Sequence, residues 1–355
     1  MTTRALVATA FALRPRGPSR LRRPTANTFG ALLVLGLVGF WLAENFVRAP
    51  TVFLSLVLVG VTTGCIYALL AMGYTLIYGI LDTINFAHGQ VFIFGAMISA
   101  SVGRQWGLGS ASPAREILVL ALMLLGATGL SAAMSGAIEF VAFRPLRGAP
   151  RVAPLIASIG VVFILQNVLL VWQSGNSFNA INPVLPGGQI FRLYGFSFTW
   201  DKLVVIFLAL AMLLLLVFIL GGTRYGKAIR ATSQDRQAAA LVGVNVNRTI
   251  LLTFLLAGAL AGAAGFVYLI YETNVSWDQG FHLGLIALTA AVLGGIGSPT
   301  GAILGALVIG ITEALNDGLR WHAPGSDWTL TIVFVILIVL LVLRPTGLIG
   351  RGQAE

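Results

Sequence analysis

Residues 84–89, INFAHG, place polar side chains beside a glycine between two apolar runs, and Gln90 follows them. Asn85 and Gln90 carry amides that donate and accept hydrogen bonds, and His88 carries an imidazole that titrates near neutral pH. In water this stretch would be an ordinary loop. Inside a bilayer, a helix break is tolerated only where protein or a water-filled cavity satisfies the freed backbone groups. The stretch therefore predicts hydrogen bonding at a helix break, and its surroundings decide whether it also borders a pathway.

A second stretch of this kind is LGGIGSPTG, residues 293–301, in which Gly294, Gly295 and Gly297 precede Pro299. Glycine next to proline at this density predicts a tight turn or a helix break. Glycines also let helices pack closely. A role in packing and a role as a moving gate both stay open.

Motifs for catalysis are missing from the sequence. It contains no H-E-x-x-H zinc motif and no G-x-S-x-G nucleophile elbow, and its three histidines, His88, His282 and His322, lie far apart. Residues 221–227 spell G-x-x-x-x-G-K, but Ala228 follows where a phosphate-binding loop needs Ser or Thr for magnesium. We therefore expect neither an enzyme nor a cofactor bound by this chain itself.

The composition indicates a membrane protein. Of 355 residues, 57% are hydrophobic and 10% charged, and the mean hydropathy is +0.93. A soluble domain is nearer a quarter charged. Apolar windows of about 20 residues, enough to cross the hydrocarbon core, recur along the chain. The predicted fold class is all-α, a polytopic helical membrane protein. Its single cysteine, Cys65, says nothing about a redox compartment.

About ten apolar segments are expected, with uncertain ends. They are 29–47, 51–72, 88–103, 116–140, 152–173, 202–220, 250–271, 283–298, 300–316 and 328–343. The eighth and ninth are two short spans or one re-entrant element. Ten spans with five in each half would permit an inverted repeat, a common plan for transporters, but similarity between the halves does not establish it.

Charge supports this count and orients it. With alternating spans and the N-terminus inside, 16 of the 22 Lys and Arg residues fall on the cytoplasmic side. This excess of Lys and Arg on the cytoplasmic side explains the net charge of +10 better than nucleic-acid binding does. We expect a basic cytoplasmic tail over 1–28, one transmembrane domain over 29–350, and a short tail over 351–355. Both termini are then cytoplasmic.

Two loops exceed turn length, one outside over 174–201 and one inside over 221–249. Helical spacing in the inside loop predicts one or two short amphipathic helices at the cytoplasmic surface. Its stretch QAAALVG, 237–243, has the spacing of the E-A-A-x-x-x-G loop of bacterial ABC importer permeases, with Gln for Glu. The alternative is a loop lying on the bilayer. The candidate ATPase-docking residues are Gly226, Arg230, Asp235, Ala238, Ala239 and Gly243.

Four stretches together resemble one family: residues 73–96, 226–265, 290–315 and 344–350 (RPTGLIG). Their order and content are similar to the membrane permease of branched-chain amino acid ABC importers, and they cover most of residues 50–350. The resemblance implies an inner-membrane subunit that pairs with a second permease, related or identical. It also implies two cytoplasmic ATPases, which bind ATP and magnesium, and a periplasmic binding protein that delivers the solute. Since the family also transports urea, short amides and other amino acids, these remain alternative cargoes.

On this topology the INFAHG break lies toward the cytoplasmic half of the membrane. The candidate residues of the translocation path and its broken helices are Tyr74, Tyr78, Asn85, His88, Gln90, Gly294, Gly295 and Gly297. The structural alternative is that Asn85 and His88 cap the following helix and satisfy the break.

A self-sufficient carrier or channel is the competing class. A coupled carrier needs a carboxylate in mid-span, but Asp82 and Glu139 are expected near inner helix ends and Glu313 near an outer one. For Glu313 we favour an interfacial cap or ion pair over lining a cavity. These positions favour the importer permease.

Overall fold

The computed structural model describes residues 26–108, 112–150, 152–172, 178–179, 188–193, 196–319, 321, 323–344 and 347–349. Most of the predicted basic tail, 1–28, and all of 351–355 lie outside these ranges. The described residues up to Leu42 belong to one compact unit, and those from Ala43 onward to another. The candidate sites all lie in the second unit.

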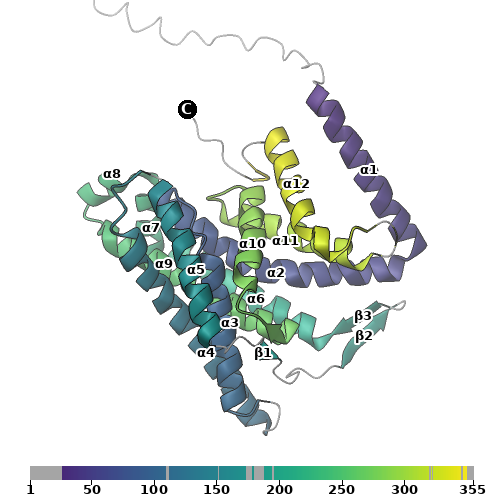
Figure 1. Cartoon of the computed structure of the whole chain (residues 1–355), viewed down its shortest axis with the longest axis horizontal. Coiled ribbons are helices and arrows are strands. Elements are labelled where there is room, and N and C mark those ends of the chain that lie inside the picture. The colour runs from purple at the N-terminus through teal and green to yellow at the C-terminus, as the bar shows by residue number, and fades with distance from the viewer. Residues whose placement is uncertain are drawn as a thin grey trace, which may run out of the picture. The chain divides into compact units, whose positions relative to one another are not determined.

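The described chain is mainly helical, which confirms the predicted fold class, and a helix occupies each of the ten predicted segments (Figure 1). Those ten helices are α1 (Ala26–Arg48), α2 (Pro50–Leu81), α3 (His88–Gln105), α4 (Pro113–Ile138), α5 (Val152–Trp172), α6 (Trp200–Gly222), α9 (Val246–Glu272), α10 (Gln279–Gly294), α11 (Pro299–Gly318) and α12 (Thr329–Leu343). A π-helical turn, η1 (Glu139–Phe143), continues α4, and a 3-10 turn, η2 (Ser326–Trp328), leads into α12.

Within the described residues, six helices are long and apolar enough to cross a membrane: α2, α4 with η1, α5, α6, α9 and α11. The others are shorter, less apolar or partly outside the described side chains. The chain is thus a multi-pass membrane protein, and the number of ten crossings stays a prediction.

Local sequence explains several helix ends. Pro50, Pro113 and Pro299 stand in the first turns of α2, α4 and α11, where a missing N–H costs nothing. Asp82 ends α2 in the left-handed conformation at φ 54°. Aspartate is one of the few non-glycine residues that tolerate this region.

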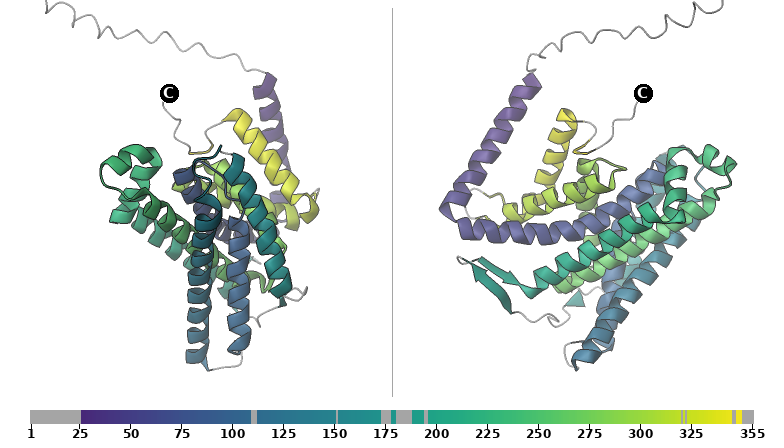
Figure 2. Two further views of the ribbon diagram at one scale, coloured as in Figure 1. Left: turned by 60° about the vertical axis from the view of Figure 1, so that its left-hand side comes forward. Right: turned by 180° about the vertical axis from the view of Figure 1, so that it is seen from behind.

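The buried centre of the second unit is built around α2 and α9. The long helix α2 packs against α9, α10 and α11, and α9 packs in turn against α3 and α4 (Figure 2). Glycines make these contacts close: a Cβ atom at Gly60 would overlap the backbone of α11, and one at Gly265 the backbone of α3. Small residues are what lets helix backbones approach inside a membrane.

By contrast, α4, α5 and α6 present apolar side chains outward. Leu125, Phe163 and Phe207 are all exposed. Apolar side chains exposed along whole helices require lipid or a partner subunit to cover them.

The predicted outer loop, 174–201, contains strands that the sequence analysis did not predict. β2 (Gln189–Leu193) pairs antiparallel with β3 (Phe196–Thr199), and this hairpin precedes α6. β1 (Phe178–Asn179) pairs antiparallel with β4 (Asn274–Val275). The second pairing joins the loop before α6 to the connection between α9 and α10.

The inside loop forms two short helices, as predicted: α7 (Arg224–Gln234) and α8 (Arg236–Leu241). Figure 1 shows them together beside the start of α9, which both helices contact. The eighth and ninth segments are two separate helices, α10 and α11, that pack on one another across a turn at 295–298.

Candidate translocation site at the α2–α3 break

The break between α2 and α3 is ordered by its own polar groups. The Asn85 Oδ1 atom accepts a hydrogen bond from the Ala87 N–H at 3.1 Å, and the Phe86 N–H donates to the Ser158 hydroxyl on α5 at 3.2 Å. Asn85 is buried, and its Nδ2 atom has no partner among the described residues. Asn85 thus hydrogen-bonds within the break, as predicted, but its side chain does not cap α3.

His88 has different surroundings from those expected of a cap. It is the first residue of α3, fully buried, with its ring 4.8 Å from the Tyr74 ring in an edge-to-face contact. Neither ring nitrogen has a well-aligned hydrogen-bond partner among the described residues, and the Leu70 carbonyl is the polar group that faces it. The side chain therefore does not cap α3, and that alternative is wrong for His88.

The start of α3 also meets the start of α10. A Cβ atom at Gly89 would overlap the Gly280 carbonyl and the Gly284 backbone of α10. The Gln90 amide donates weakly to the Trp277 carbonyl at 3.5 Å, and its buried Oε1 atom has no described partner. The N-terminal ends of two helices thus meet beside α2, where the Gln90 Oε1 atom has no partner among the described residues.

Both predicted tyrosines belong to this junction. The Tyr74 hydroxyl accepts a hydrogen bond from the Gly89 N–H and lies close to Gly284. Tyr74 and Tyr78 line one small cleft with Ile84 of the break and Ile296 of the α10–α11 turn. The structure therefore brings the two glycine-containing motifs together across α2.

The predicted turn at LGGIGSPTG is confirmed. Gly294 is the last residue of α10, and Gly295 and Gly297 have φ values of 108° and 88°, which side chains with a Cβ rarely adopt. A Cβ atom at Gly294 would overlap the Gly301 backbone. The three glycines shape the turn, whereas Ile296 carries the contact with the cleft. Nothing here tests movement as a gate.

Residues 348 and 349, which follow α12, hydrogen-bond to the end of α10 beside this turn. The Leu348 N–H donates to the Leu293 carbonyl at 2.9 Å, and the Ile349 N–H donates to the Gly294 carbonyl at 3.0 Å. Two carbonyls at the end of α10 are thereby satisfied by residues beyond α12.

Glu313 lies deeper in its helix than the sequence predicts. It lies inside α11, more than one turn before its end at Gly318, and forms a side-chain hydrogen bond with the buried Tyr67 of α2. No ion pair within the described residues involves it, and its Oε2 atom is buried without a partner. The expected cap or ion pair is wrong, because the helix continues past Glu313. Its position removes one of the arguments against a coupled carrier.

The candidate docking residues have defined structural roles in the inside loop. The Thr223 hydroxyl accepts from the Gly226 N–H at 3.1 Å and begins α7, and the Arg230 guanidinium donates to the Leu220 carbonyl. Gly226 packs against the last carbonyls of α6, which leaves no room for a Cβ atom. These two residues fasten α7 to α6.

The stretch QAAALVG forms α8 and its end. The Asp235 carboxylate accepts from the Gln237 and Ala238 N–H groups and begins the helix, and Gly243 follows its end at φ 87°. Ala239 is only 3% exposed and faces its own chain, whereas Ala238 faces outward. Leu241 and Val242 are 89% and 79% exposed. The tip of α8 is thus a short apolar surface.

Among the described residues, no three His, Cys, Asp or Glu side chains are grouped so that they could hold a metal ion. The site chemistry described above is hydrogen bonding and close packing at helix ends, within a multi-pass helical membrane protein.

The fold defines the class as a multi-pass helical membrane protein, and the sequence comparisons define its family. The sequence matches the family described as the branched-chain amino acid transport system permease component over residues 29–342, and the chain belongs to that family. It is 36% identical over 306 residues to the high-affinity branched-chain amino acid transport system permease protein BraD of Pseudomonas aeruginosa, covering 83% of this chain and 95% of that protein.

Two further relatives are informative. LivH of Escherichia coli K12, a permease protein of the same transport type, is 36% identical over 308 residues, which is 85% of this chain and 97% of LivH. The ribose import permease protein RbsC of Escherichia coli K12 is 27% identical over 319 residues, 88% of this chain and 91% of RbsC. No solved structure matches.

Proposed function

We propose that this chain forms part of the translocation path of an ATP-driven importer for branched-chain amino acids. The observation that carries the proposal is the similarity to BraD and LivH over nearly their whole lengths. The more distant similarity to a ribose permease supports a shared transport machine and leaves urea, short amides or another amino acid as alternative cargoes.

The proposed path borders the junction of α2, α3 and α10. Asn85, His88 and Gln90 each hold a buried polar atom there that makes no well-aligned hydrogen bond to a described residue. Burying such groups costs free energy unless something satisfies them. Water or a polar solute would do so when the helix ends separate. Intramembrane polar groups of this kind are functional candidates by default.

The proposed ATPase contact is the tip of α8. Leu241 and Val242 are among the most exposed large apolar side chains of the described chain. They lie on a loop whose charge favours the cytoplasmic side. An apolar surface in that position fits a groove on a cytoplasmic partner better than it fits water. ATP and magnesium would be bound by that partner.

The remaining partners follow from the same reading. A second permease subunit, identical or related, would cover part of the apolar surface of the spans, and a periplasmic binding protein would deliver the solute. The chain would lie in the inner membrane with both termini cytoplasmic.

Co-purification tests this assembly. The chain is tagged, extracted gently from its host membrane, and its stoichiometric partners are identified by mass spectrometry. We expect ATPases with phosphate-binding loops and a second permease subunit. A chain that takes up solute without any ATPase would instead be a secondary carrier, and the proposal would be wrong.

His88→Ala tests the path. We expect initial uptake to fall by more than the amount of protein in the membrane, because the variant removes a ring that packs between α2 and α3 at the break. Uptake is divided by the permease level measured in the same vesicles. A ratio equal to that of the unaltered protein would remove His88 from the path.

A further inference from the structure

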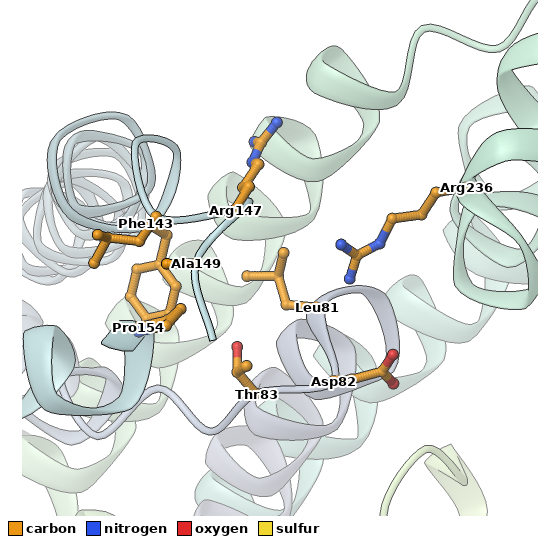
Figure 3. A pocket seen from close by; sticks show the side chains of 9 residues that line it. Leu81, Asp82, Thr83, Phe143, Arg147, Ala149, Pro154 and Arg236 are labelled. Atoms are coloured by element: carbon orange, nitrogen blue, oxygen red, sulfur yellow. The ribbon is translucent and has the colours of Figure 1, made fainter. Parts of the chain in front are cut away.

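The end of α2 carries a second cavity that the proposed path does not use. A space of about 190 Å³ opens between the end of α2, the segment that follows η1, and α8 (Figure 3). One water occupies about 30 Å³ in the liquid, so the cavity has room for a small organic solute. It is lined by Leu81, Asp82, Thr83, Phe143, Leu146, Arg147, Ala149, Pro154 and Arg236.

Two polar atoms in this lining lack the partners that burial requires. The Thr83 hydroxyl and the Arg147 Nε atom are buried without a hydrogen bond to any described residue. The other Arg147 nitrogens are engaged, since they donate to the Glu139 carboxylate and the Asn247 side chain. Buried donors in folded proteins are nearly always satisfied by protein, water or a ligand. The Arg147 Nε–H can only donate and the Thr83 hydroxyl can donate as well as accept, so one acceptor group would satisfy both atoms.

Charged groups of both signs complete the site. The Arg236 guanidinium donates to the Ile80 carbonyl at 2.7 Å, and Figure 3 shows it reaching from α8 toward Leu81 and Asp82. The Asp82 carboxylate is exposed and forms no ion pair within the described residues. The Asp82 carboxylate thus remains available to a cation.

The rest of the wall is apolar. Leu81 and Phe143 are buried hydrophobic residues, and Pro154 is buried beside them. The cavity therefore combines guanidinium and hydroxyl donors, one carboxylate, and an aliphatic and aromatic surface. An α-amino acid with an aliphatic side chain carries the complementary groups: a carboxylate, an ammonium and a hydrocarbon chain.

We propose that this cavity binds an aliphatic α-amino acid from the cytoplasmic side. Its carboxylate would accept from Thr83 and the two arginines, and its ammonium would pair with Asp82. The class of ligand is inferred from the lining of the cavity. Only the use of leucine as the first probe rests on the proposed function. The site is separate from the junction around His88 and would bind solute that has already entered the cell.

The position of Arg236 gives the site a consequence. This residue is the first of α8, and its bond to the Ile80 carbonyl ties that helix to the end of α2. An amino acid that engages Arg236 would therefore act on the helix proposed to contact the ATPase. Imported amino acid that accumulates in the cytoplasm would in this way inhibit its own import.

Equilibrium binding of radiolabelled L-leucine tests the proposal. The full chain, with its co-purifying subunits but without the binding protein, is placed in nanodiscs. Competitors are 4-methylpentanoate, which lacks the ammonium, 3-methylbutylamine, which lacks the carboxylate, and inorganic phosphate. We expect unlabelled leucine to compete at least tenfold better than any of the three, because only leucine satisfies both charged ends.

Two variants locate the binding. Asp82→Asn keeps a residue that tolerates the left-handed backbone and removes only the charge. It should weaken leucine binding about tenfold and leave 4-methylpentanoate binding unchanged. Thr83→Val keeps the shape and removes the hydroxyl, so it should weaken both. Asp327→Asn and Thr128→Val, at sites away from the cavity, are the matched controls and should leave binding unchanged.

Four results would overturn the proposal: no leucine binding, leucine binding unaffected by Asp82→Asn and Thr83→Val, displacement by phosphate as effective as by leucine, or 4-methylpentanoate that binds as tightly as leucine. Leucine uptake that depends on the binding protein is measured in parallel. Intact uptake with no cytoplasmic binding rejects the cavity alone, whereas absent leucine uptake rejects the proposed cargo.

Discussion

His88 is fully buried and packs closely against α2. Gly73 of α2 packs against the imidazole so closely that a Cβ atom there would overlap the ring. Overpacking of this kind costs about 1–3 kcal/mol. We expect Gly73→Ala to lower the aggregation temperature of the solubilised protein by several degrees.

Gly79→Ala is the control for that substitution, because Gly79 is on the same helix and has open space where the methyl group would lie. Its aggregation temperature should stay equal or rise slightly, as expected for alanine in a helix. Equal losses in both variants would mean that helix flexibility, and not contact with His88, is the cause.

A second residue-scale prediction concerns Glu139 and Arg147. The Glu139 side chain is 1% exposed and pairs with the Arg147 guanidinium, which is 17% exposed. Burial lowers the pKa of Arg147 and the nearby Glu139 carboxylate opposes this shift. Removing one partner of a buried pair costs about 3–5 kcal/mol. Arg147→Met should therefore greatly reduce the yield of folded protein.

The double variant Glu139→Gln with Arg147→Met should recover most of that yield, since no buried charge is then left unpaired. Yield is measured by fluorescence-detected size exclusion. A double variant that is as poor as Arg147→Met would show that the Arg147 contacts with Asn247 and the cavity wall matter more than the charge pair.

At the scale of helices, the crossing of α2 and α11 depends on glycine. Cβ atoms at Gly60, Gly64 and Gly310 would each overlap the backbone of the facing helix. Gly310→Ala should separate the two helices and cost about 1–3 kcal/mol, seen as a lower aggregation temperature. Gly129→Ala on α4, where nothing lies nearby, is the control and should be neutral.

The tip of α8 yields a prediction about assembly. Leu241→Asp replaces an apolar side chain that is 89% exposed, so the fold should tolerate it, whereas an apolar docking contact should not. We expect the co-purified ATPase to fall at least fivefold with unchanged permease yield. Gln234→Asp, exposed on α7, should leave the ATPase bound. Loss of ATPase in both variants would indicate a general charge effect.

Ala239 and Gly243 are less suitable probes of the same contact. Ala239 is buried against its own chain, and Gly243 has a positive φ that other residues adopt with strain. Bulk at either position would disturb the loop itself as well as any docking.

The helices could be predicted because apolar periodicity and turn-forming Gly and Pro residues are local signals in the sequence. The two short helices of the inside loop and the turn around Gly295 were expected for that reason. The hairpin β2–β3, the partner of Glu313 and the cavity beside Arg147 were not. The partner of Glu313 and the cavity depend on segments distant in sequence, such as Tyr67 beside Glu313, whereas the hairpin pairs neighbouring residues and was missed as a local signal. One sequence gives the residue types but not these pairings.

For the whole molecule, the orientation of the spans is the central prediction. Cys65 is the only cysteine and is buried, so a single cysteine introduced elsewhere can be labelled without interference from a second exposed thiol. In a Cys65→Ala background, Ser112→Cys should react with a membrane-impermeant maleimide from the periplasmic side, and Ser233→Cys only after the cells are opened. Labelling of both from the same side would disprove the alternation.

The hydrogen bonds from Leu348 and Ile349 to the end of α10 have a consequence for biosynthesis. The ribosome completes α10 and α11 well before it reaches residue 347, so these two carbonyls wait for their donors while α12 is still being made. A chain whose synthesis stops after α12 contains every span but leaves the turn at Gly295 open. Such a product would be distinguishable to membrane proteases from a finished subunit, and these last contacts would therefore mark the completion of folding.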